Sequence, residues 1–148
     1  MKQVKTFDTI HNKEIDEKFH QLNIGNIGNV IYWWEFLEAI SKVPGDIVEC
    51  GIGRGRSLII ISALNYFRAE KVGGERNIFA YDSFEGFPEP TDEDESIRKP
   101  KQGEWSDSPS GKYEYSKEFT ELVLAEAGLP LEDFSLNIKK GFFSEFLK

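Results

Sequence analysis

Residues 47–57 read Ile47-Val-Glu-Cys-Gly-Ile-Gly-Arg-Gly-Arg-Ser57 and carry the strongest structural signal in the chain. An apolar run enters a turn with three glycines, and a strongly apolar helical segment follows over residues 57–67. Glycine lacks a Cβ, so the backbone can take positive φ and a ligand can approach it closely. A helix that opens near Gly55 directs free N–H groups toward an anionic ligand group. We predict a strand, a ligand-binding turn and a helix; an ordinary tight turn is the alternative.

A second predicted strand, at residues 77–81, ends directly before Asp82. In doubly wound α/β folds, an acidic residue at the tip of the second strand accepts hydrogen bonds from ribose hydroxyls. Asp82 follows Gly51 by 31 residues, whereas the dinucleotide version of the motif has roughly 20. A long helix and the loop at residues 71–77 can account for the additional residues between Gly51 and Asp82. We expect Asp82 to bind a ribose; the alternative is a turn former after a strand.

The spacing of the glycines distinguishes between the classes of cofactor that this turn could bind. The dinucleotide fingerprint is G-x-G-x-x-G/A, but here the third glycine comes one residue early, as Gly51-Ile-Gly53-Arg-Gly55. No Gly-Lys-Ser/Thr ends the turn, so the phosphate loop of the nucleotide triphosphatases is absent from it. Glu49 would repel a pyrophosphate and suits a ligand with an ammonium or sulfonium charge. A nicotinamide-dependent oxidoreductase is therefore a less favoured alternative.

Residues 49–57 resemble the first motif of class I S-adenosylmethionine-dependent methyltransferases. Three further strings stand out: Pro44-Gly-Asp-Ile-Val-Glu-Cys-Gly51, Tyr81-Asp-Ser-Phe-Glu-Gly-Phe-Pro88 and Lys140-Gly-Phe-Phe143. They are similar to the macrocin O-methyltransferase family, whose members methylate sugar hydroxyls of natural products. The resemblance covers roughly residues 30–148. It implies an S-adenosyl-L-methionine-dependent O-methyltransferase with a sugar or natural-product hydroxyl, a small molecule, as acceptor.

The resemblance also implies which residues contact the cofactor. The turn glycines lie beneath its methionine part, Glu49 favours the cationic end, and Ser57 helps to hold the carboxylate. The second strand supplies contacts to the ribose and adenine, and the turn after the third strand lies at the adenine edge. The expected cofactor-binding residues are Glu49, Gly51, Gly53, Gly55, Ser57, Asp82, Ser83, Gly141 and Phe142.

The predicted elements give an α/β fold: a Rossmann-like, doubly wound, mainly parallel sheet with flanking helices. In the family the strand order runs three, two, one, four, and the catalytic acids and magnesium ligands follow the fourth and fifth strands. We therefore expect a fold truncated after its third strand, with no assigned catalytic residue, and with magnesium only in a full-length form. The predicted strands are residues 46–50, 77–81 and 134–139, and the main predicted helices are residues 30–41, 57–67 and 114–127.

Two domain segments are expected: an N-terminal helix and loop at residues 1–29, and the N-terminal part of a methyltransferase domain at residues 30–148. Within the first segment, residues 12–22 are predicted to be helical and residues 23–29 to be a loop. The first strand would be a bare sheet edge, which favours a homo-oligomer or a complementing chain as partner. A non-catalytic, degenerate relative that serves as a binding or assembly module is the alternative function.

A long polar segment at residues 85–112 separates the second strand from the last predicted helix. Loops of this length in compact domains are usually functional or disordered. We expect it to be lid-like. One interpretation is that it covers the cofactor, with Trp105 or Phe87 closing on the ligand. For its acidic run at residues 92–95, the alternative is a solvated surface.

Composition and charge narrow the remaining classes of partner, cellular location and metal site. The chain has 18 basic and 26 acidic side chains and a formal net charge of −8, which does not favour nucleic acid as a partner. It lacks a long apolar run and an apolar signal core, so we expect no membrane association and a cytoplasmic location. Cys50 is the single cysteine and is predicted to be a small buried hydrophobe of the first strand. His11 and His20 lack spaced Cys or His partners, so no metal site is expected.

Overall fold

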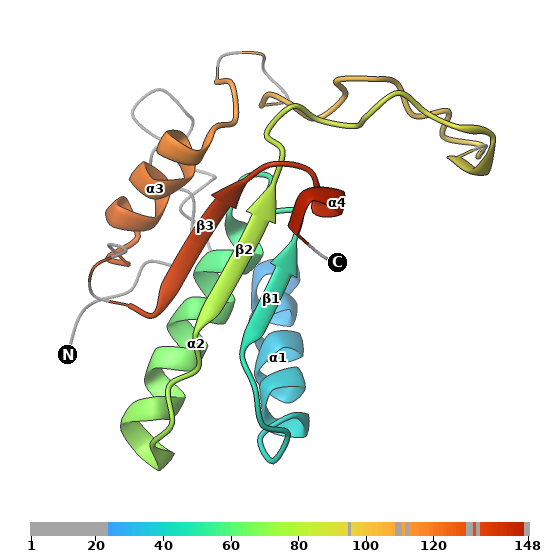
Figure 1. Cartoon of the computed structure of the whole chain (residues 1–148). Coiled ribbons are helices and arrows are strands. Elements are labelled where there is room, and N and C mark those ends of the chain that lie inside the picture. The colour runs from blue at the N-terminus through green and yellow to red at the C-terminus, as the bar shows by residue number, and fades with distance from the viewer. Residues whose placement is uncertain are drawn as a thin grey trace.

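The computed structural model describes residues 24–94, 96–108, 111, 113–129, 132 and 134–146. Three parallel strands form one sheet in which β2 lies between β1 and β3, as Figure 1 shows. The predicted α/β class and the order three, two, one are thereby confirmed. Within the described residues β1 is one edge of the sheet. The strands are β1 (Ile47–Cys50), β2 (Ile78–Asp82) and β3 (Leu136–Lys140).

The hydrophobic core lies between the sheet and the helices on one of its faces. Helices α1 (Ile24–Ala39) and α2 (Arg56–Val72) run behind the sheet, and α3 (Lys117–Glu126) lies beside β3 (Figure 1). Apolar side chains of α2 pack with alternate residues of the strands, because successive strand residues point to opposite faces. Members of this core cluster are Leu58, Ile59 and Ile61 of α2, Ile78 and Ala80 of β2, Leu136 and Ile138 of β3, and Val123 and Leu124 of α3.

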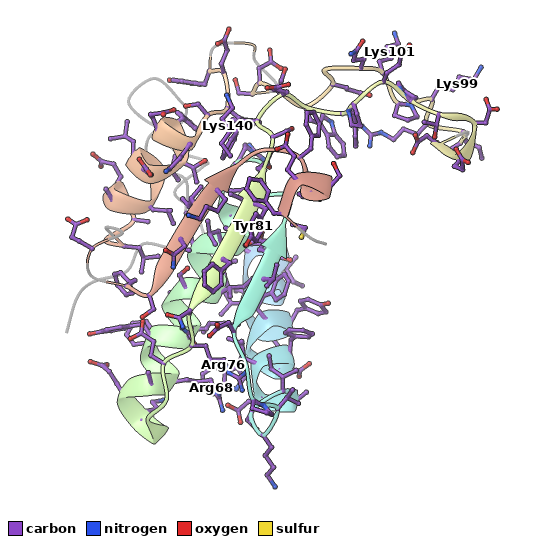
Figure 2. All side chains as sticks on the ribbon, viewed as in Figure 1. Arg68, Arg76, Tyr81, Lys99, Lys101 and Lys140 are labelled. Carbon is purple, nitrogen blue, oxygen red and sulfur yellow. The ribbon has the colours of Figure 1, made fainter. Side chains whose placement is uncertain are left out.

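The opposite face of the sheet is largely open. Val48 of β1 is 54% exposed, and Asn137 and Lys139 of β3 are also exposed. Among the described helices, the short α4 (Phe143–Phe146) contacts this face, and the ring of Phe146 lies 5.2 Å from that of Tyr81. Tyr81 is labelled on β2 in Figure 2. Sheets of this class are normally covered on both faces.

Helix α1 begins earlier than the sequence predicts. The loop expected at residues 23–29 is wrong, because α1 is helical from Ile24 onward. Glycine inside a helix costs only about 1 kcal/mol, and Ile24, Ile27 and Ile31 recur at helical spacing. The helix predicted at residues 12–22 lies outside the described residues.

The end of α1 is fixed to the sheet by Arg76. Its guanidinium donates to the carbonyl oxygens of Ile40 at 3.0 Å, Val43 at 2.6 Å and Gly45 at 2.8 Å. These acceptors lie in the connection from α1 to β1, so one side chain before β2 holds the segment that leads into β1. Arg68 of α2 adds an ion pair near the same end of α1 (Figure 2), 2.7 Å from Glu38.

Residues 83–116 connect β2 to α3 and are called here the β2–α3 segment. Its described part is largely irregular and contains the short 3-10 helix η3 (Asp92–Asp94) and an isolated antiparallel bridge between Asp107 and Glu114. It leaves the carboxyl end of the sheet and extends away from the strands and helices (Figure 1). The segment ends where Ser116 caps α3 by accepting a hydrogen bond from the Phe119 N–H at 3.0 Å. Within the described residues, no helix has both the length and the apolar character needed to cross a membrane.

Candidate functional site

The turn after β1 is held by the carboxylate at the end of β2. The N–H groups of Ile52 and Gly53 donate to Asp82 Oδ2 at 2.7 and 2.9 Å. The N–H of Phe84 donates to Asp82 Oδ1 at 2.7 Å. Neighbouring parallel strands end at the same edge of a sheet, so the two motifs predicted from the sequence lie in direct contact. Sequence reasoning did not anticipate that Asp82 would also position the glycine turn.

The glycines of the turn have the backbone conformation for which glycine is favoured. Gly51, Gly53 and Gly55 have φ values of 92°, 53° and 77°, which side chains rarely tolerate. A Cβ added to Gly51 or Gly53 would meet no atom within 4 Å. The space beside these two residues is therefore open to a ligand, and the backbone there can be approached closely.

Glu49 and Ser57 pair with each other beside this turn. Ser57 Oγ donates a hydrogen bond to Glu49 Oε1. Glu49 Oε2 is buried and, within the described residues, lacks a hydrogen-bond partner. Burial raises the pKa of Glu49 from about 4.5 to about 7; the Ser57 hydrogen bond opposes this rise, and the negative charge of Asp82 adds to it. The pair thus places a carboxyl group that is half-ionised near neutral pH behind the glycine turn.

A cavity of about 500 Å³ opens at the carboxyl ends of β1 and β2. Its volume lies in the range of small-molecule sites. The glycine turn and Asp82 form one side, and aromatic residues of the β2–α3 segment and of the turn after β3 form the others. The lining residues are Cys50, Gly51, Ile52, Gly53, Asp82, Ser83, Gly86, Phe87, Pro88, Glu104, Trp105, Phe142 and Phe143.

Five of the nine predicted cofactor residues line this cavity: Gly51, Gly53, Asp82, Ser83 and Phe142. Glu49 instead lines a neighbouring cavity of about 350 Å³ between α1 and β1, and the two cavities share Cys50 and Gly51. Gly55 and Ser57 lie at the start of α2, behind the turn. A contact between these three residues and a ligand stays a prediction.

Gly141 shapes the cavity through the backbone. Its N–H donates to the Asp82 carbonyl oxygen at 3.0 Å, and its φ is 149°. A Cβ at this position would collide with the side chains of Glu145 and Phe146. Gly141 therefore permits α4 to fold back against the end of β3 and places Phe142 on the cavity wall.

The prediction that Cys50 is a buried hydrophobe is wrong, because the residue is exposed and lines the cavity. Strand residues alternate between faces. Since Glu49 points toward the helices with Ile47, Cys50 shares the open face with Val48. This alternation was the signal available in the sequence. Within the described residues, no group of three or more His, Cys, Asp or Glu side chains is arranged to hold a metal ion.

Comparisons with known proteins bear on the family and the overall fold. Residues 35–148 match the family model described as Macrocin-O-methyltransferase (TylF). The fold resembles the crystal structure of CalS11, described as a calicheamicin methyltransferase, with a TM-score of 0.64 at 20% sequence identity, over 90% of this chain and 49% of that one. It also resembles the O-methyltransferase NovP, with a TM-score of 0.53 at 25% identity, over 83% of this chain and 47% of that one. This chain therefore spans about half the length of these structures, and no curated protein matches its sequence.

Proposed function

Because the chain belongs to the macrocin O-methyltransferase (TylF) family, we propose that it carries the cofactor-binding part of an S-adenosyl-L-methionine-dependent O-methyltransferase. One observation supports this most strongly. The Asp82 carboxylate accepts hydrogen bonds from the glycine turn at 2.7 and 2.9 Å and faces a cavity of small-molecule size. The arrangement joins a backbone that a ligand can approach closely to an acid at the tip of the second strand, which is the position that binds ribose in doubly wound folds.

The residues present fit an adenosyl ligand. A carboxylate can accept about four hydrogen bonds, and the described N–H groups supply three of them to Asp82. One acceptor position is thus left for a ribose hydroxyl, and Ser83 lies next to it on the cavity wall. When bound, S-adenosyl-L-methionine supplies an activated methyl group for transfer to an acceptor oxygen.

Glu49 would interact with the cationic end of the cofactor. Its Oε2 is buried without a described partner, and burial keeps its pKa at about 7. A cationic group that approached this carboxyl would lower the pKa again, because an opposite charge favours the ionised form. Ser57 already donates to the other oxygen and so fixes the orientation of the carboxyl.

We further propose a small-molecule hydroxyl as the methyl acceptor, with a sugar of a natural product as the class that the resemblance to the macrocin O-methyltransferase family implies. No catalytic residue is assigned to this chain. Acceptor contacts and magnesium ligands are likewise left unassigned.

Cys50 offers a direct test of cofactor binding. It is the single cysteine of the chain and lines the proposed site, so its alkylation rate reports on occupancy of the cavity. We expect S-adenosylhomocysteine to slow labelling by iodoacetamide in a saturable manner, whereas NAD at the same concentration leaves the rate unchanged. Protection by NAD alone, or no protection of a demonstrably folded sample, would reject the proposal.

A further inference from the structure

The outer wall of the cavity is built from two arms of the β2–α3 segment that pair with each other. The Phe87 N–H donates to the Glu104 carbonyl oxygen at 3.1 Å, and the Gly103 N–H donates to the Phe87 carbonyl oxygen at 2.9 Å. Residues separated by a long loop are thus joined directly beside the cavity. Gly86, Phe87, Glu104 and Trp105 all line it, so the paired arms are part of the site.

The approach of the two arms depends on Gly86. Its φ is 74°, and a Cβ there would lie 2.5 Å from the Glu104 carbonyl oxygen and 2.6 Å from the Gly103 carbonyl carbon. Trp105 also has a positive φ, 71°, which is unusual for a bulky residue. The close pairing therefore fixes Trp105 in a position that its backbone alone would not favour.

Arg98 folds back from the outer part of the segment onto the aromatic residues of the wall. Its guanidinium carbon lies 3.8 Å from the centre of the Trp105 ring and 5.4 Å from that of Phe87. The two rings lie 5.1 Å apart. A guanidinium over an aromatic face is a favourable cation–π arrangement. The exposed Lys99 and Lys101 mark the outer part of the segment in Figure 2.

Glu104 ties this cation to the paired arms. Its Oε1 lies 3.3 Å from Arg98 Nη2, and its Oε2 accepts a hydrogen bond from the Lys101 N–H at 3.2 Å. Arg98 therefore contacts Trp105 through its planar face and Glu104 through its edge. Trp105 is nevertheless 62% exposed and lines the cavity, so part of the indole surface is free to meet a ligand.

We propose that Trp105 is the residue of the β2–α3 segment that stacks on the purine ring of the cofactor, and that Arg98 is the positioning residue that holds the indole in place. The inference rests on the proposed function. Three observations support it. Trp105 lines the same cavity as Asp82, and other aromatic side chains form the wall around Trp105. Arg98 covers part of the Trp105 ring. Bases stack favourably on the faces of aromatic side chains.

Tryptophan fluorescence and calorimetry test the proposal on the whole chain. S-adenosylhomocysteine should quench the wild-type emission, and Trp105→Phe should abolish that quenching. Trp34→Phe is the matched control, since Trp34 lies on α1 beside Lys71, and should retain the quenching. In calorimetry, Trp105→Ala should weaken S-adenosylhomocysteine about tenfold or more, while Trp105→Phe, which keeps an aromatic ring, should weaken it less.

The role of Arg98 is tested separately. Arg98→Ala should weaken S-adenosylhomocysteine several-fold and should increase iodide quenching of the Trp105 emission, because the indole loses its cover. Lys99→Ala removes a neighbouring exposed cation and should change neither quantity. Iodide quenching responds to the indole environment itself, which a general loss of stability in a folded sample would not mimic.

The outcomes separate this inference from the proposed function. If the folded wild-type chain does not bind S-adenosylhomocysteine, the proposed function fails and the inference fails with it. If the wild type binds but Trp105→Ala and Trp105→Phe bind equally well and still show quenching, the inference alone is overturned. If Trp105→Ala loses its circular dichroism, Trp105→Phe decides the result.

Discussion

Glu49 lies beside the glycine turn of the candidate site and also affects the stability of the folded protein. One oxygen of its carboxyl accepts from Ser57 Oγ, and the other is buried without a described partner. The sequence predicted that this acid lies at the turn, and its contact with a cation stays a prediction. The pairing with Ser57 could not be predicted, because it depends on how α2 leaves the turn.

The pH dependence of unfolding tests the state of Glu49. Burial raises its pKa in the folded protein from about 4.5 to about 7, so the folded state holds the proton more tightly than the unfolded chain. The free energy of unfolding should therefore fall as pH rises through this window, by up to about 3 kcal/mol. Glu49→Gln should raise it by about 1–3 kcal/mol at pH 8 and by much less at pH 5.5, as measured by urea denaturation.

Glu35→Gln is the matched control, because Glu35 is exposed on α1. It should leave the free energy of unfolding nearly unchanged at both pH values. An equal effect of Glu49→Gln at pH 8 and pH 5.5 would contradict a raised pKa.

Asp82 is the site residue whose position the sequence predicts best. A strand followed by an acid predicted its place at the tip of β2, and the parallel register brings it beside the glycine turn. The three N–H donors that it accepts from Ile52, Gly53 and Phe84 follow from the exact turn geometry. Spacing alone does not encode that geometry.

At the scale of elements, the sequence predicts the strands and α2, but not the start of α1 or the contacts within the β2–α3 segment. The three strands and α2 were predicted from apolar runs between turn residues. The start of α1 was missed, because Gly25 and Gly28 suggest a loop while the isoleucine spacing favours a helix. The pairing of residues 86–87 with residues 103–104 was also missed, since contacts between the arms of a long polar loop leave no periodic pattern.

The two glycines of the paired arms provide a matched test of that pairing. Gly86 and Gly103 have similar φ values, 74° and 73°, but a Cβ at Gly103 would have its nearest contact at 4.0 Å, compared with 2.5 Å at Gly86. Both changes to alanine should carry the cost of positive φ, about 1 kcal/mol. Gly86→Ala should additionally separate the arms.

Limited proteolysis can detect this separation. We expect Gly86→Ala to be cleaved within residues 87–104 several times faster than the wild type, and Gly103→Ala to be cleaved at a rate close to that of the wild type. Equal cleavage rates for the two variants would show that the arms do not approach as closely as described.

At the scale of the whole molecule, the open face of the sheet and its β1 edge are uncovered within the described residues. Val48 and Cys50 of β1 are exposed on a face that parallel sheets normally bury. The sequence predicted this edge from the strand order of the family. We propose that a second polypeptide, either another copy or a complementing chain, covers it.

Sedimentation at increasing protein concentration tests the proposed self-association. We expect the wild type to associate, and Val48→Lys to weaken association by placing a charge on the open face. Ile97→Lys is the control, because Ile97 is fully exposed in the β2–α3 segment, and should associate like the wild type. A wild-type chain that stays monomeric at all concentrations would contradict a second copy as the partner.

The central claim is that the Asp82 carboxylate and the glycine turn form an adenosyl-binding site, and isothermal titration with S-adenosylhomocysteine tests it most directly. The account predicts saturable binding to the wild type, at least about tenfold weaker binding to Asp82→Asn, since a charged hydrogen-bond acceptor is lost, and unchanged binding to the exposed Asp92→Asn. No binding to the folded wild type, or equal binding to Asp82→Asn, would contradict it.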